Sequence, residues 1–188
     1  MAKKNNIEVM SPVGSYEALY AAIEAGCNSV YFGVEGLNMR SRSANNFTID
    51  DLRKIASIAQ QHNVRTYLTL NTVVYDSEMD YMKSILIAAK ESGVTAVIAA
   101  DLAVIQYANQ IGLEVHLSTQ CNITNSEAVR FFSKFADVIV TARELSLQQV
   151  KAITQWIEEN DIKGPSGRQL EIECFVHGAL CMAVSGKC

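Results

Sequence analysis

The chain has 188 residues, of which 49% are hydrophobic and 19% are charged, a composition typical of one globular domain with a substantial core. Its net charge of −4 argues against a broad basic face for nucleic acid, although a local basic patch stays compatible with it. No apolar run approaches the roughly 18 residues that a membrane span requires, and residues 1–6 contain lysines but no apolar signal-peptide region. We therefore expect one domain over residues 1–188, acting in the cytoplasm without a membrane partner.

The first half of the chain alternates short apolar runs with helix signals. The apolar runs predict strands at residues 7–10, 29–34 and 65–74, with Ser11-Pro12-Val13-Gly14 as the turn after the first. Between them, Ser15 and the pair Thr48 and Asp51 are typical helix caps, and glycines stop two of the helices. The predicted helices span residues 15–26, 48–62 and 76–93.

The second half continues the same alternation. Strands are predicted at residues 96–100, 114–119, 137–141 and 170–176, and helices at 101–112, 125–135 and 146–159. Ser146 with Gln149 predicts a capping box for the last helix. A loop of glycine, proline and serine, residues 164–167, precedes the seventh strand.

Seven strands alternating with six helices fit two α/β folds, a (β/α)8 barrel or a doubly wound open sheet. The strands are continuous apolar runs, as in parallel sheets covered on both faces. No G-x-G-x-x-G or phosphate-binding loop follows the first strand, which weakens the nucleotide-binding open sheet. We therefore predict a TIM-barrel-like fold with parallel strands and seven βα units, truncated before its last strand.

Polar residues follow nearly every predicted strand. In a (β/α)8 barrel the carboxyl-terminal ends of the strands carry the functional groups, so these residues predict one shared polar pocket. The positions at the strand ends are Ser11, Gly14, Glu35, Asn71, Asp101, Ser118, Gln120, Arg143, Glu144 and His177. From this set we take Glu144, Arg143, His177, Gln120 and Asn71 as the candidate catalytic residues.

The five cysteines are an odd number in a chain without an export signal, which favours thiols or metal ligands over disulfides. We expect Cys174 to be a buried residue inside the last strand and Cys27 to be structural, while Cys121 could approach the pocket. Cys181 and Cys188 lie seven residues apart in a loop of small residues where a cluster could fit, a spacing unlike that of zinc ribbons or ferredoxins.

The three histidines suggest different roles. We expect His62 to cap a helix in solvent and His116 to be packed or hydrogen-bonded inside its strand. His177 stands at a strand end beside Cys181, so a Cys–His nucleophile pair is conceivable, as is a set of Ser118, His177 and Glu144. Neither a G-x-S-x-G nor an H-E-x-x-H motif supports a standard hydrolase.

Residues 173–188, E-C-F-V-H-G-A-L-C-M-A-V-S-G-K-C, resemble the signature of the U32 peptidase family, also called collagenase-like proteases. Shorter blocks agree with it over nearly the whole chain: S-P-V-G-S at 11–15, V-Y-F-G at 30–33, L-N-T at 70–72, H-L-S-T-Q at 116–120 and A-R-E-L-S at 142–146. Family members are considerably longer, so the resemblance implies an N-terminal fragment.

The resemblance implies a barrel-like catalytic domain and peptidase activity, with collagen as the substrate of some members. As the alternative, other members take part in hydroxylating tRNA, ribosomal RNA or ubiquinone, several with a [4Fe–4S] cluster on four cysteines. The first two of these ligands match Cys181 and Cys188, and the others would lie beyond residue 188. The expected substrate is thus a peptide or RNA, and we expect the cluster in the full-length protein but not in the fragment.

A barrel that lacks its eighth strand would expose the edges of its first and seventh strands. Unpaired N–H and C=O groups on such edges recruit other strands. We therefore expect the 188-residue chain to self-associate, as a two-fold dimer.

Overall fold

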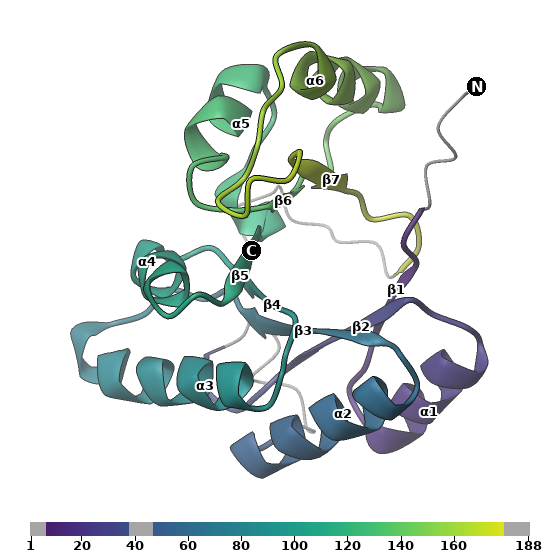
Figure 1. The fold of residues 1–188 in the computed structure, drawn as a ribbon, viewed down its shortest axis with the longest axis vertical. Helices are drawn as coiled ribbons and strands as arrows, with labels where there is room; N and C mark the ends of the chain where they lie inside the picture. Colours follow the sequence, from purple (N-terminus) through teal and green to yellow (C-terminus); the bar gives the residue numbers. More distant parts are fainter. Residues whose placement is uncertain (1–6, 38–46, 179–188) are drawn as a thin grey trace.

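The computed structural model describes residues 7–37 and 47–178. Its seven strands form one sheet, curled into a half-barrel with the helices on its outer side (Figure 1). The strands are β1 (Met10–Pro12), β2 (Ser29–Gly33), β3 (Arg65–Leu70), β4 (Ala96–Ala99), β5 (Glu114–Leu117), β6 (Val138–Val140) and β7 (Glu171–Glu173).

The order of the strands decides between the two predicted folds. Each strand pairs in parallel with the next one along the chain, giving the order β1-β2-β3-β4-β5-β6-β7. A doubly wound sheet would reverse its strand order at a switch point, so this sheet has the barrel topology. Within the described residues β1 pairs only with β2 and β7 only with β6, so the arc is open between them (Figure 1).

The predicted helix caps are confirmed. The hydroxyl of Ser15 accepts a hydrogen bond from the backbone N–H of Ala18, and capping boxes form between Thr48 and Asp51 and between Ser146 and Gln149. The helices are α1 (Tyr16–Glu24), α2 (Ile49–Gln61), α3 (Met79–Glu91), α4 (Leu102–Gln110), α5 (Ser126–Phe132) and α6 (Leu147–Glu159), with short 3₁₀ turns η1 (Asp76–Glu78) and η2 (Thr119–Cys121).

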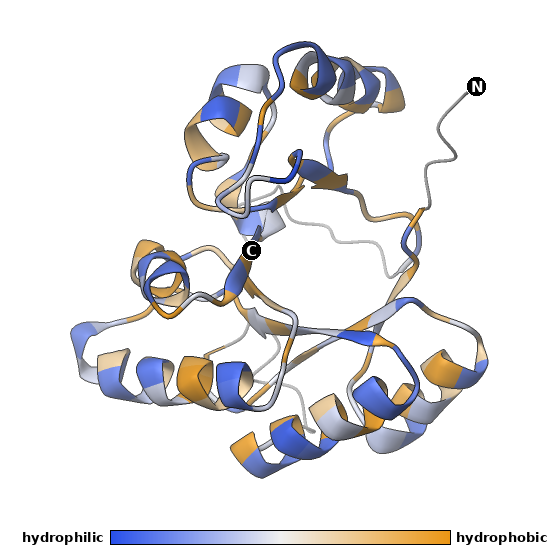
Figure 2. Cartoon of the chain, viewed as in Figure 1, coloured by the Kyte–Doolittle hydropathy of each residue, from blue (hydrophilic) through white to orange (hydrophobic). Residues whose placement is uncertain are grey.

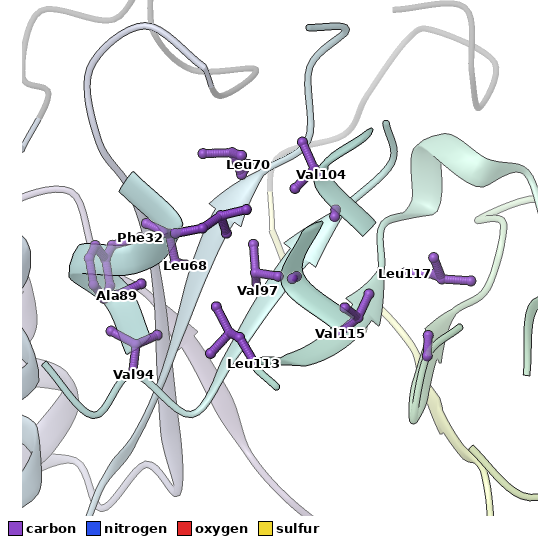
Figure 3. Close-up of a cluster of buried hydrophobic side chains, with 14 of the residues drawn as sticks. Phe32, Leu68, Leu70, Ala89, Val94, Val97, Val104, Leu113, Val115 and Leu117 are labelled. Carbon is purple, nitrogen blue, oxygen red and sulfur yellow. The ribbon is translucent and has the colours of Figure 1, made fainter. Parts of the chain in front are cut away.

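The main core lies between the sheet and the helices. Side chains on the convex face of the strands, such as Phe32, Leu68 and Val97, are buried against apolar helix residues such as Ala89 and Val104 (Figure 3). The helices carry both hydrophobic and hydrophilic residues around their surface, as one-sided packing requires (Figure 2). Each large aliphatic side chain buried in this layer contributes about 1.5–3 kcal/mol, so this layer holds the arc together.

The concave face of the sheet is formed by the alternate residues of the same strands, because successive side chains of a strand point to opposite faces. A second, smaller apolar cluster lies there, made of Tyr67, Ala96 and Ile98 with Met10 and Tyr31 packed against it. This face also carries polar residues, which form the site described below.

The strand boundaries that differ most from those predicted belong to β1, β3 and β7; the other four strands differ by one or two residues at their ends. β1 lies later than expected and includes Pro12; β1 pairs on one side only in the described chain, so the missing N–H of Pro12 is tolerated. β3 ends at Leu70, because the backbone N–H of Val74 instead donates to the Asp101 carboxylate. β7 ends at Glu173, three residues before the predicted end.

Among the helices of the described ranges, 7–37 and 47–178, none combines the length and hydropathy needed to cross a membrane.

Candidate functional site

A pocket of about 70 Å³ opens on the concave face, toward the carboxyl-terminal ends of the strands. All seven strands, or the residues just after them, contribute to its wall. The lining residues are Met10, Tyr31, Thr69, Asn71, Ile98, Ser118, Thr119, Val140, Glu173 and Phe175. Because a cavity needs about 10–15 Å³ on this measure to hold one water molecule, the pocket has room for a small reacting group.

Asn71 and Ser118 form the polar wall of the pocket. Nδ2 of Asn71 donates to Oγ of Ser118 over 3.4 Å, and the backbone N–H of Gln120 donates to the same oxygen over 3.3 Å. The second contact makes Ser118 the cap of η2, which fixes its side chain. Since Oγ accepts both bonds, the hydroxyl hydrogen of Ser118 can donate into the pocket.

Glu173 is the acidic residue of the pocket. It is the last residue of β7, and Val140 of β6 is its register partner. Burial raises the pKa of its carboxyl group from 4.5 to about 7; the charge of Glu8 adds to this rise, and His116 opposes it. A carboxyl group that titrates near neutral pH can both take and give a proton there, which is the property of a general acid–base catalyst.

Beneath the pocket, toward the amino-terminal ends of the strands, lies a network of paired charges. Nη2 of Arg168 donates to Oε2 of Glu114 over 2.7 Å, and the hydroxyl of Tyr67 donates to Oε1 of Glu8 over 2.6 Å. Arg65 also pairs with Glu8. The first contact ties the segment before β7 to β5, and the two contacts of Glu8 tie the segment before β1 to β3.

The comparisons with known proteins give the family. The model of Peptidase family U32 matches residues 14–188. This chain belongs to the U32 family. The match covers most of the chain, including the pocket residues from Tyr31 to Phe175.

Curated relatives of this U32 chain have two kinds of name. It is 59% identical over 184 residues to a protein of Porphyromonas gingivalis (strain ATCC BAA-308 / W83) named collagenase, covering 98% of this chain and 44% of the relative. It is 32% identical over 184 residues to a tRNA hydroxylation protein of Bacillus subtilis (strain 168), covering 96% of this chain and 41% of the relative. The chain therefore spans less than half the length of these relatives.

A solved structure supports the half-barrel. The U32 chain superposes on a U32 peptidase with a TM-score of 0.67 and 17% sequence identity, over 82% of this chain and 67% of the other. At this identity the likeness concerns the fold.

The predicted catalytic residues fall into two groups in the U32 structure. Asn71 lines the pocket, whereas Gln120, Arg143, Glu144 and His177 are not among its lining residues. Gln120 adjoins the pocket through its backbone N–H, which donates to Ser118, and the guanidinium of Arg143 stands 6.0 Å from the ring centroid of Phe175, another lining residue. The catalytic roles of all five residues, Asn71, Gln120, Arg143, Glu144 and His177, stay predictions.

Other strand-end residues have structural contacts. Oδ1 of Asp101 accepts the N–H of Ala103 over 2.8 Å, and Oδ2 accepts that of Val74 over 3.1 Å. Asp101 is therefore the cap of α4 and holds the chain after β3. The sequence analysis also considered a set of Ser118, His177 and Glu144. In the structure Glu144 and His177 are exposed, whereas Ser118 is buried.

The described cysteines do not form a reactive centre. Cys174 is exposed, with Sγ 3.6 Å from Oγ1 of Thr141; the prediction that it is buried was wrong, because β7 ends one residue earlier. Cys121 packs against the core and is not a pocket residue, and burial raises its thiol pKa to about 11. A thiol with that pKa is protonated at neutral pH and is a poor nucleophile. Cys27 is half-buried against the core, as a structural residue should be.

Cys181 and Cys188 lie outside the described residues. Within residues 7–37 and 47–178, no group of three or more His, Cys, Asp or Glu side chains could hold a metal ion. Thiolates are the ligands that iron–sulfur clusters use, so the donor chemistry of Cys181 and Cys188 fits such a cluster. The described residues add no further set of ligands to it.

Of the ten lining residues, the sequence analysis named only Asn71 and Ser118 as pocket residues; the two titratable ones that it missed are Glu173 and Tyr31. Residues 170–176 were taken as a buried apolar strand, although Glu171 and Glu173 alternate in it and therefore share one face. In a barrel strand that face is the interior, so this alternation was the available signal.

The predictions for the other two histidines are confirmed: His62 is an exposed helix cap, and His116 is buried and hydrogen-bonded.

Proposed function

We propose that this chain is the barrel portion of a U32-family peptidase, with Glu173 as its general acid–base residue. The observation that carries the proposal is the position of Glu173: the residue lines the pocket and is half-buried, and this partial burial raises the pKa of its carboxyl group to about 7. A catalyst is most effective when its pKa lies near the working pH. The collagenase name of the 59% identical relative supports peptide hydrolysis as the reaction.

In this proposal the ionised Glu173 takes a proton from a water molecule, which attacks the peptide carbonyl carbon. The same carboxyl group then returns the proton to the leaving nitrogen. The hydroxyl of Ser118, held by Asn71 and by the backbone N–H of Gln120, would donate to the oxygen on which negative charge develops. This scheme requires neither a nucleophilic cysteine nor a metal ion in the described part of the chain.

Peptide cleavage by the full-length protein tests this function. We expect gelatin and a fluorogenic collagen-like peptide to be cut by the wild-type protein and not by Glu173→Gln. Glu171→Gln is the matched control, because Glu171 lies on the same face of β7 but is exposed and outside the pocket wall. Equal cleavage by the wild-type protein and Glu173→Gln would remove Glu173 from the mechanism.

A second candidate is assistance in hydroxylating tRNA, ribosomal RNA or ubiquinone. It is supported by the relative named a tRNA hydroxylation protein, which matches 96% of this chain, and by the two cysteines at 181 and 188. Cys181 and Cys188 would hold a [4Fe–4S] cluster together with ligands from the longer protein, and the cluster would supply one-electron chemistry. In this reading too, the pocket would bind the reacting group.

One experiment separates the two candidates. The full-length protein is purified anaerobically and assayed for iron and sulfide, for peptide cleavage, and for hydroxylated nucleosides in cellular RNA after deletion of its gene. Cleavage without iron supports the peptidase; stoichiometric iron with loss of a hydroxylated nucleoside supports the second candidate. We infer a cytoplasmic location in either case, supported by the odd number of cysteines.

A further inference from the structure

His116 is a buried histidine with one unpaired ring nitrogen. Its side chain is 4% exposed, and its ring lies against that of Tyr67, with centroids 4.6 Å apart. Nε2 lies 3.2 Å from Oε1 of Glu114, whereas Nδ1 is buried and has no hydrogen-bond partner within the described residues. Leaving such a group unpaired costs about 1–3 kcal/mol, so Nδ1 needs a partner that the hydrogen bonds above do not supply.

The contact with Glu114 fixes which nitrogen carries the hydrogen. The hydrogen bond with His116, together with the one from Arg168, lowers the pKa of Glu114, so this carboxyl group is ionised near neutral pH. An ionised carboxylate can only accept hydrogen bonds. The hydrogen between the two groups therefore belongs to Nε2, and the neutral imidazole has its lone pair on Nδ1. Nδ1 is thus an acceptor that requires a donor.

Glu173 is placed to be that donor. His116 is in register with Val138, which is in register with Glu171; Glu173 lies two residues further along β7, on the same face. Two strands across a sheet is roughly 10 Å between backbones, and two residues along a strand add about 7 Å in the strand direction; both side chains point to the concave side. A charged His116 opposes the rise in the pKa of Glu173 that burial causes. A protonated carboxyl group has the O–H that Nδ1 lacks.

We propose that Glu114, His116 and Glu173 form a proton relay beneath the pocket, in which Nδ1 of His116 receives the proton of the Glu173 carboxyl group. The O–H bond of Glu173 breaks and an N–H bond forms at Nδ1 through one bridging water, which takes the proton from Glu173 and passes one of its own to Nδ1, because Nδ1 has no direct hydrogen-bond partner within the described residues. The imidazolium keeps its Nε2–H bond to the Glu114 carboxylate, and Glu173 becomes a carboxylate, so the net charge of the group is unchanged.

The relay deepens the proposed function and rests on it, because it gives Glu173 a second route, besides the leaving nitrogen, by which to lose its proton and become a carboxylate. His116 is a positioning residue and proton acceptor behind Glu173, since it does not line the pocket. The other charged groups around it already have partners. Glu8 accepts from Arg65 and Tyr67, and Arg168 donates to Glu114 and lies near Glu171.

The relay is tested by ¹⁵N NMR of histidine-labelled full-length protein, in which the chemical shifts of the two ring nitrogens report the tautomer. The sequence described here has three histidines, and the variants His62→Gln and His177→Gln identify the signals of the other two. At a pH above the Glu173 titration we expect His116 to carry its hydrogen on Nε2. A neutral His116 with the hydrogen on Nδ1 would overturn the proposal without any variant having to fold.

The second readout is the coupling between the chemical shifts of His116 and the titration of Glu173. In Glu173→Gln the amide can donate to the bridging water but cannot transfer a proton, so the change in the His116 shifts that accompanies the Glu173 titration, near pH 7, should disappear. Conversely, His116→Gln should move the midpoint of the Glu173 carboxyl titration, followed by ¹³C NMR, by about one pH unit. The variant His62→Gln should move neither signal. Unchanged His116 shifts in Glu173→Gln would overturn the relay.

These outcomes are independent of the reaction that the protein catalyses. If Glu173→Gln abolishes activity but leaves the His116 shifts unchanged, the relay is wrong and the role of Glu173 stands. If the shifts are coupled but no peptide is cleaved, the relay stands and the proposed reaction is wrong.

Discussion

Asn71 and Ser118, which follow β3 and β5, are joined by a hydrogen bond of 3.4 Å from Nδ2 to Oγ, although 47 residues separate them in sequence. β4 lies between their strands, so the bond crosses the carboxyl-terminal edge of the sheet. The bond places the polar wall of the pocket beside β3 and β5, whereas Glu173 belongs to β7, two strands after β5 in the sheet. The arc of strands is thus what converts separate loop residues into one site.

The first prediction concerns stability and pH. Burial raises the pKa of Glu173 from 4.5 in the unfolded chain to about 7 in the folded one. The folded state therefore holds a proton that the unfolded state releases between these values. Stabilisation from this group is complete below pH 4.5 and is lost as the pH rises through about 7. The loss is roughly 1–3 kcal/mol, because one pKa unit corresponds to about 1.4 kcal/mol.

Urea unfolding at about pH 5 and about pH 8 measures this effect. The difference in unfolding free energy between the two conditions should be smaller in Glu173→Gln than in the wild-type protein, since the amide does not ionise. Glu171→Gln should keep the wild-type difference. The same pH dependence in wild type and Glu173→Gln would show that Glu173 titrates normally.

The second prediction concerns the cysteines outside the described residues. Cys181→Ala and Cys188→Ala should each abolish iron binding in the full-length protein, because each removes a thiolate ligand. Cys27→Ala should leave the iron content unchanged, since Cys27 precedes β2 at the opposite end of the strands. Iron and sulfide assays on anaerobically purified protein measure the effect. Full iron content in both loop variants would refute the ligand assignment.

The third prediction concerns Arg143, whose guanidinium faces Phe175 at the rim of the pocket. Arg143→Ala should reduce activity several-fold, because the variant loses both the charge and the contact that orders Phe175. Its unfolding free energy should change by only about 0.5 kcal/mol, as for other exposed residues. Activity per folded molecule and the melting temperature are the two measurements. A large drop in melting temperature with activity preserved would show a structural role instead.

The fourth prediction concerns self-association. Among the described strands β1 and β7 each have one unpaired edge, and Val9 beside β1 is 57% exposed. We propose that two copies of the 188-residue chain pair along such edges as a two-fold dimer. Light scattering after size-exclusion chromatography should give twice the monomer mass, and Val9→Lys should lower it. Val73→Lys, at an exposed position away from these edges, is the control. A strictly monomeric wild-type chain at high concentration would contradict the proposal.

Much of the fold could be predicted from the sequence because the signals are local. Caps such as Ser15 and Thr48 depend on neighbouring residues alone, and these two mark the starts of α1 and α2 correctly. The parallel order of the strands followed from the alternation of strands and helices. The ends of the strands are less local: β3 stops at Leu70, and the backbone N–H of Val74, which was predicted to lie in this strand, donates to Asp101, 27 residues away.

The site was predicted only in part, for a physical reason. Which strand-end residue enters the pocket depends on the register between strands and on the direction of each side chain. Asn71 lines the pocket but Gln120 does not, although both follow a strand. The raised pKa of the Glu173 carboxyl group depends on burial by residues that are distant in sequence, and no local sequence pattern predicts that burial. Cys174 was misplaced for a similar reason, because the apolar residues after β7 do not continue the strand.

The central claim is that Glu173 is the acid–base residue of the pocket. The pH dependence of kcat/KM for peptide cleavage by the full-length protein tests it most directly. The account predicts a rate that rises with the ionisation of a group near pH 7, a profile that is lost in Glu173→Gln together with about 10²–10⁴-fold of the rate. A Glu173→Gln variant with the wild-type rate and the same inflection would contradict the account.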